Sequence, residues 1–157
     1  MFFALLQKKL NMKDKEDFGL EWYKPDTNSS TDLPLADSGV RAGFPSPAED
    51  HIEGRLDLTK LVVTHPDATF YARVEGDSMK DECVEDGDLL VVDKSLNPQD
   101  GNLVVSYIDG EFTLKRIRLT DDKILLVPAN KNYPTIEIDP QSDFRVWGVV
   151  RYVVKKM

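Results

Sequence analysis

The sequence predicts a mainly β domain that follows an extended N-terminal arm. From Leu56 onward, short apolar runs are separated by turn residues, and few segments are long enough for a helix. Before that point, residues 24–50 contain four of the nine prolines, among many Ser, Thr, Asp and Gly residues. Such a segment buries too little apolar surface to offset its ordering entropy, so we expect a mobile arm and then one domain.

Period-two alternation marks the first strand of the predicted domain. Thr69 to Glu75 places Phe70, Ala72 and Val74 on one face and polar or larger side chains on the other. A short buried strand is expected at Leu89 to Val92, behind a turn. Further strands are predicted at Ile124 to Val127, Thr135 to Ile138 and Phe144 to Val154.

A β-hairpin is predicted around the dipeptide Asp109-Gly110. This dipeptide tolerates the positive φ angles of a two-residue type I′ turn, and the predicted strands Leu103 to Ile108 and Glu111 to Arg118 flank it. We therefore expect two adjacent antiparallel strands in this part of the chain.

The register of this hairpin places Lys115 among apolar side chains. Pairing across the two-residue turn puts Val104 opposite Lys115, on a face that Thr113 and Ile117 share. Burial disfavours the charged ammonium and so lowers the lysine pKa from its ordinary value of about 10.4. A neutral amine can act as a general base near neutral pH. The hairpin taken alone also allows Lys115 to be a surface lysine on an edge strand.

Ser78 follows the first predicted strand, in the sequence Gly76-Asp77-Ser78-Met79. The glycine permits a sharp turn that can expose the hydroxyl and direct backbone N–H groups at an oxyanion. Lys80 stands where the second glycine of a G-x-S-x-G elbow would be, so this is not an α/β-hydrolase motif. A serine in such a turn can equally be a hydrogen-bonding turn residue. A neutral Lys115 beside it could instead activate it as a nucleophile.

Three segments, in order and at compatible spacing, resemble the LexA/UmuD family of self-cleaving serine-lysine proteases, and its UmuD branch most closely. They are Ala42-Gly43-Phe44-Pro45-Ser46-Pro47-Ala48, then Gly76-Asp77-Ser78-Met79 with Asp86-Gly87-Asp88-Leu89-Leu90-Val91-Val92-Asp93, then Asp109-Gly110-Glu111-Phe112-Thr113-Leu114-Lys115. The resemblance extends from about Pro34 to the end of the chain. It implies the β-rich protease domain of that family.

The resemblance also implies the parts of a catalytic site. Ser78 would be the nucleophile and Lys115 the general base, with an oxyanion hole formed by backbone N–H groups of Asp77 and Ser78. The scissile bond would join Ala42 to Gly43. No metal or other cofactor is implied.

We place the domain boundary at Gly43, one residue past the scissile bond. Residues 1–43 are expected to form the arm that self-cleavage removes, and residues 44–157 the peptidase domain. Ala42 and Gly43 have little side-chain bulk, so access to the carbonyl between them is sterically easy. The prolines that follow favour an extended conformation, in which the arm could lie across an active-site cleft.

Partners are likewise implied by the resemblance. The family acts in the SOS response to DNA damage, where RecA filaments on single-stranded DNA stimulate self-cleavage. The trimmed protein, a homodimer, would be a subunit of an error-prone translesion polymerase of the UmuC type, with the sliding clamp as a further contact.

Composition excludes several other classes. The net charge of −8, from 28 acidic and 20 basic residues, repels a phosphate backbone, so direct DNA binding is not expected. The single cysteine, Cys83, forms no internal disulfide, which fits the bacterial cytoplasm or a phage- or plasmid-encoded protein there. No stretch approaches the roughly 20 apolar residues of a membrane span. His51 and His65, without neighbouring cysteines, give little support to a metal site.

Two other functions remain open on the sequence. The chain could be a non-catalytic β-rich docking module for a DNA polymerase, in which Ser78 and Lys115 have no catalytic role. It could also be a fragment of a LexA-like repressor, although the segment before Ala42 is too short, and too poor in apolar periodicity, for a helix-turn-helix domain. Self-cleavage of the purified protein separates these alternatives.

Overall fold

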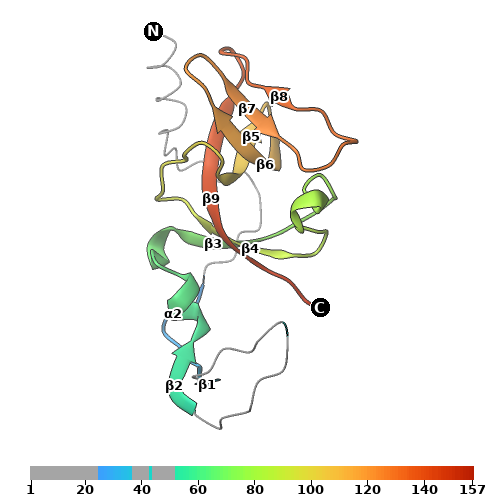
Figure 1. The fold of residues 1–157 in the computed structure, drawn as a ribbon. Helices are drawn as coiled ribbons and strands as arrows, with labels where there is room; N and C mark the ends of the chain where they lie inside the picture. The colour runs from blue at the N-terminus through green and yellow to red at the C-terminus, as the bar shows by residue number, and fades with distance from the viewer. Residues whose placement is uncertain (1–24, 37–42, 44–51) are drawn as a thin grey trace.

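The computed structural model describes residues 25–36, 43 and 52–157, and these residues form a mainly β structure, as predicted (Figure 1). The elements in chain order are β1 (Asp32–Ala36), β2 (Ile52–Asp57), α2 (Leu58–Val62), the 3-10 helix η1 (Pro66–Ala68), β3 (Thr69–Arg73), the 3-10 helix η2 (Lys80–Glu82), β4 (Leu89–Asp93), β5 (Leu103–Ile108), β6 (Glu111–Leu119), β7 (Ile124–Val127), β8 (Ile136–Glu137) and β9 (Phe144–Val154).

Seven strands form one antiparallel sheet in the order β3-β4-β9-β5-β6-β7-β8. The last strand, β9, lies between β4 and β5 and joins the two halves of the sheet (Figure 1). Its pairing shifts register once against each neighbour, between Val91 and Val92 and between Val105 and Ser106. Such bulges increase local twist, which lets one strand of eleven residues serve both halves.

The predicted hairpin is confirmed, together with its register. Ile108 pairs with Glu111 and Val104 pairs with Lys115. The turn residues Asp109 and Gly110 have φ angles of 47° and 99°, which are the positive values that a type I′ turn requires. The strand bounds predicted from Ile124 and from Phe144 also agree with β7 and β9.

Two apolar clusters fill the interior of the sheet domain. The first lies around β5, β6, β7 and β9, and its buried members are Val104, Ile117, Ile124, Leu126, Ile138, Phe144 and Val149. The second lies around β3, β4 and the segment after β3, and its buried members are Val74, Met79, Val84, Leu90, Val92 and Val105. The segment that carries Ser78 is therefore anchored on the second cluster through Met79.

A separate two-stranded sheet precedes the sheet domain, and the sequence did not predict it. Here β1 pairs with β2, with Leu33 opposite Leu56 and Pro34 opposite Arg55. Asp57 then caps α2 by accepting hydrogen bonds from the Thr59 and Lys60 N–H groups. The strand β1 lies within the segment assigned to the arm. Apart from residues 25–36 and 43, the segment expected to be a mobile arm lies outside the residues that the structure describes.

Candidate active site

Ser78 lies in a turn that two neighbouring residues shape. Gly76 adopts a φ of 87°, in the region that favours glycine, and its N–H donates to Asp86 Oδ1 at 2.8 Å. On the other side, Met79 is only 2% exposed and packs in the second apolar cluster. Ser78 is thereby held half-buried between a turn and an anchored side chain.

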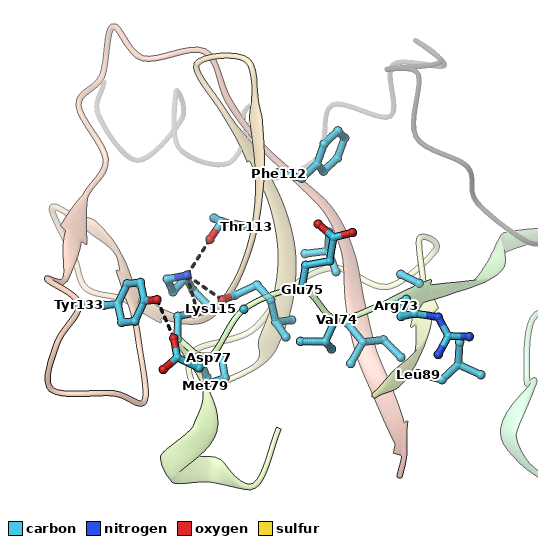
Figure 2. A pocket seen from close by; sticks show the side chains of 16 residues that line it. Arg73, Val74, Glu75, Asp77, Met79, Leu89, Phe112, Thr113, Lys115 and Tyr133 are labelled. Atoms are coloured by element: carbon cyan, nitrogen blue, oxygen red, sulfur yellow. Dashed lines mark hydrogen bonds between the residues drawn. The ribbon is translucent and has the colours of Figure 1, made fainter. Parts of the chain in front are cut away.

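The Lys115 amine reaches this serine from β6. Its Nζ lies 2.9 Å from Ser78 Oγ, 2.7 Å from Thr113 Oγ1 and 3.0 Å from the Leu114 carbonyl oxygen. Figure 2 shows the Lys115 amine in the pocket, with a dashed line to the Thr113 hydroxyl. Three acceptors thus fix the position of Nζ, and the contact with Ser78 is short enough for proton transfer.

Burial lowers the pKa of the Lys115 ammonium from its ordinary value. The residue is 7% exposed, while Val104 opposite it and Ile117 beside it are fully buried. An ammonium group among apolar neighbours loses part of its hydration. The neutral amine therefore forms at a lower pH than it does for a solvated lysine. The environment predicted for Lys115 from the hairpin register is therefore present in the structure.

A pocket of about 550 Å³ adjoins the Ser78 and Lys115 side chains. Its apolar lining comes from β3, β4, β5, β6 and the segment after β3, and consists of Ala72, Val74, Met79, Leu89, Leu90, Val105, Phe112 and Leu114. Asp77, Thr113 and Tyr133 contribute polar atoms (Figure 2). A largely apolar hollow with a few convergent polar groups is the usual form of a binding or active site.

The two residues predicted to supply the oxyanion donors both border this pocket. Asp77 and Ser78 both line it, and the Ser78 N–H has no intramolecular acceptor among the residues that the structure describes. A backbone N–H beside a nucleophile is the group that stabilises an oxyanion in acyl transfer.

The sequence did not reveal the groups that hold the Ser78 turn against its surroundings. Tyr133 OH donates to Asp77 Oδ1 at 2.6 Å, and Asn130 Nδ2 donates to the Asp77 carbonyl oxygen at 3.0 Å. Shortly after the turn, Glu82 of η2 forms an ion pair with Arg116 of β6. The hydrogen bonds from Arg116 hold the pKa of the Glu82 carboxyl below its ordinary value. These partners are 34 to 56 residues apart along the chain, so no local pattern could have indicated them.

Of the predicted cleavage site, the structure describes only Gly43. Gly43 is exposed and is not among the residues that line the pocket, while Ala42 lies outside the described residues. Both belong to the connection between β1 and β2. Within the described part of the chain, no group of His, Cys, Asp or Glu side chains is arranged to hold a metal ion, and no helix is long and apolar enough to cross a membrane.

Comparison with known proteins defines the class to which this fold and site belong. Residues 34–151 match the family model described as Peptidase S24-like. The chain therefore belongs to the Peptidase S24-like family of serine peptidases, the LexA/UmuD family that its motifs resemble.

Individual relatives agree with this assignment. Protein MucA of Salmonella typhimurium is 43% identical over 121 residues, which cover 76% of this chain and 82% of MucA. Protein ImpA of Escherichia coli is 39% identical over 132 residues, which cover 84% of this chain and 90% of ImpA. The LexA repressor of Xylella fastidiosa is 39% identical over 110 residues, 70% of this chain but only 52% of that repressor. MucA and ImpA are UmuD-like SOS mutagenesis proteins.

Proposed function

We propose that this protein is an autocatalytic serine endopeptidase in which Ser78 is the nucleophile and Lys115 the general base. The 2.9 Å contact between Ser78 Oγ and a buried Lys115 Nζ carries the proposal. A lysine serves as a base when burial lowers its pKa, and a serine hydroxyl becomes nucleophilic when such a base takes its proton. Both conditions meet in one pocket.

The proposed reaction uses the contact between Ser78 and Lys115. Ser78 Oγ attacks the Ala42 carbonyl carbon while its proton passes to Lys115 Nζ, and the oxyanion accepts hydrogen bonds from the Asp77 and Ser78 N–H groups. The C–N bond to Gly43 then breaks, and protonated Lys115 gives its proton to the leaving nitrogen. Water, deprotonated by Lys115, hydrolyses the Ser78 ester and restores the enzyme.

The substrate bond has to reach the pocket for this chemistry to occur. Gly43 lies in the connection between β1 and β2 and does not line the pocket. Either the β1–β2 hairpin moves relative to the sheet domain, or a second copy of the chain presents its own connection. The small side chains of Ala42 and Gly43 suit entry into a narrow cleft.

The cellular role is proposed from the relatives. Because MucA and ImpA are UmuD-like SOS mutagenesis proteins, we assign this chain to the same response. In this role a RecA filament on single-stranded DNA stimulates cleavage, and the trimmed protein, as a homodimer, joins a UmuC-type translesion polymerase. Sedimentation at micromolar concentration tests for the dimer. If only monomer is observed, the proposed dimer is wrong.

Incubation with RecA, single-stranded DNA and nucleotide tests the reaction, with fragment masses as the readout. The parent should give two fragments whose masses place the cut between Ala42 and Gly43. The Ser78→Ala and Lys115→Ala variants should remain uncut, whereas Lys80→Ala, a change of an exposed lysine near the same turn, should be cut like the parent. A folded parent that gives no fragments would favour a docking module.

Mixing two inactive variants separates cleavage within one chain from cleavage between chains. A Ser78→Ala chain keeps its cleavable bond but lacks the nucleophile, and a Gly43→Glu chain keeps the nucleophile but should not be cut. Cleavage of the Ser78→Ala chain in the mixture shows that one copy can cut another. An uncut mixture, with an active parent, shows that each chain cuts only itself.

A further inference from the structure

A loop distant in sequence holds the peptide groups on both sides of Ser78. The Ala129 N–H donates to the Ser78 carbonyl oxygen at 2.8 Å, and Asn130 Nδ2 donates to the Asp77 carbonyl oxygen at 3.0 Å. The loop is bound in return, because the Asp81 N–H donates to the Ala129 carbonyl oxygen at 2.8 Å. Two consecutive peptide groups are therefore held by the same loop.

The planarity of the peptide bond makes this contact matter for the pocket. In a trans peptide the carbonyl and the following N–H point in opposite directions. When Asn130 holds the Asp77 carbonyl, the N–H of the same peptide, which belongs to Ser78, points away from Asn130. That N–H has no acceptor among the described residues and belongs to a residue that lines the pocket.

Asn130 is built to hold this orientation. It is 5% exposed, and its Oδ1 accepts the Asn132 N–H at 3.0 Å while Nδ2 also contacts Asp77 Oδ2 at 3.2 Å. Both halves of the buried amide are thus engaged, so its rotamer is fixed. A buried amide with all its groups paired holds its partners more rigidly than an exposed side chain does.

Tyr133 also forms a hydrogen bond to Asp77. Its hydroxyl donates to Asp77 Oδ1 at 2.6 Å, and Figure 2 shows the ring directed at the Asp77 carboxylate. This hydrogen bond is the largest cause that lowers the pKa of the Asp77 carboxyl, and it raises the pKa of the Tyr133 phenol. The Asp77 side chain is thereby kept as a carboxylate turned toward the loop.

We propose that Asn130 and Tyr133 are positioning residues that orient the Ser78 N–H as the oxyanion donor of the active site. Neither side chain touches the reacting atoms. They act through Asp77, whose carbonyl and carboxylate they hold, and this role rests on the proposed self-cleavage. Removal of one oxyanion donor slows acyl transfer about 10²- to 10³-fold in serine peptidases, which sets the scale of the expected effect.

A fluorophosphonate probe tests this role without any need for the chain's own bond to reach the pocket. Ser78 Oγ attacks phosphorus, fluoride leaves, the hydroxyl proton passes to Lys115, and the phosphonyl oxygen occupies the oxyanion position. We expect Asn130→Leu to slow labelling of Ser78 about 100-fold. Tyr133→Phe should slow it about fivefold, because Asn130 still holds the carbonyl. Tyr152→Phe, at a tyrosine 39% exposed against 42% for Tyr133 and outside the pocket lining, should label at the parent rate.

A second probe separates orientation of the N–H from disruption of the turn. In a Ser78→Cys background, alkylation by iodoacetamide at position 78 displaces iodide and forms no oxyanion. Mass spectrometry of the peptides distinguishes this site from exposed Cys83. Adding Asn130→Leu or Tyr133→Phe should leave the alkylation rate within about twofold of the Ser78→Cys background, because the nucleophile itself stays in place.

The outcomes are distinct. Parent-rate phosphonylation in Asn130→Leu and Tyr133→Phe would overturn the positioning role while leaving Ser78 as nucleophile. Equal slowing of phosphonylation and alkylation would overturn it too, in favour of a purely structural role. A parent that is not labelled at Ser78 would overturn the proposed peptidase itself. If Asn130→Leu does not fold, Tyr133→Phe decides by the same two rates.

Discussion

The seven-stranded sheet and the β1–β2 hairpin differ in how well they bury their apolar side chains. In the sheet domain, Val104 and Leu126 are fully buried in one apolar cluster. In the hairpin, Leu33 and Leu35 are 62% and 49% exposed, although they lie on a paired strand. A two-stranded sheet on its own is marginally stable in water, so the two regions should differ in stability as well.

The two regions also have different roles in the proposed reaction: the sheet domain carries the catalytic groups, and the hairpin carries the bond to be cut. Ser78 and Lys115 must keep a contact of 2.9 Å, which requires the rigid support of a packed sheet. Gly43 belongs to the hairpin connection, and the bond before it has to be presented to the pocket. Movement costs less where few side chains are buried. The predictions that follow test this comparison, starting with the largest expected effect.

The pH dependence of self-cleavage tests the support that the sheet gives to Lys115. Since burial lowers the pKa of this lysine, the reactive neutral amine should accumulate at a lower pH than it would for an ordinary lysine. Without RecA, the rate should rise up to about tenfold per pH unit and level off above the lowered pKa. Autodigestion rates between about pH 7 and pH 10 measure this profile, with circular dichroism as the check on folding.

Two lysine variants control this profile. Lys115→Ala should remove the rise, and Lys80→Ala should keep it, because the Lys80 side chain is 46% exposed. The same titration affects stability, since the unfolded chain binds a proton at Lys115 between the lowered pKa and 10.5. The contribution of Lys115 to the free energy of unfolding therefore increases with pH across that window. A flat rate profile in the parent would refute Lys115 as the base.

Leu126→Ala tests the buried side of the comparison. The leucine is fully buried in the first apolar cluster, so truncation leaves a cavity and should lower the free energy of unfolding by about 2 to 5 kcal/mol. Urea denaturation measures the change. A loss below about 1 kcal/mol would mean that the sheet domain is less tightly packed than its burial indicates.

Gly148→Ala tests the close approach of β9 to β4. A Cβ at this position would lie 2.6 Å from Val92 Cγ1 and 3.2 Å from the Asp93 carbonyl oxygen. Because Val92 is fully buried and the second neighbour is backbone, we expect a loss of about 1 to 3 kcal/mol in thermal or urea unfolding. Unchanged stability would show that the two strands separate easily at this point.

Leu33→Ala makes the same leucine-to-alanine change on the exposed β1–β2 hairpin. At 62% exposure the side chain contributes little to folding, so the free energy of unfolding should change by no more than about 0.5 kcal/mol. Urea denaturation of both variants under the same conditions compares their losses in the free energy of unfolding. A loss as large as that of Leu126→Ala would show that the hairpin face is buried in solution and would remove the contrast between the two regions.

Much of the sheet domain could be predicted from local patterns. The alternation after Thr69 and the Asp109-Gly110 turn predict strands because side-chain period and turn geometry depend only on neighbouring residues. The hairpin register went further and placed Lys115 opposite Val104, since pairing across a two-residue turn leaves one alignment. The strand β1 was missed because its sequence contains a proline and its partner is separated from it by a connection of fifteen residues.

The sequence by itself indicated the candidate nucleophile and base, through the resemblance of its motifs to a known family and a register that places Lys115 among apolar residues. The tertiary structure alone decided what holds them. Asn130 and Tyr133 meet Asp77 across 53 and 56 residues, and Glu82 meets Arg116 across 34. Such contacts depend on how β6, β7 and the loop after β7 fold back onto the segment after β3, and no local pattern along the chain encodes that distance.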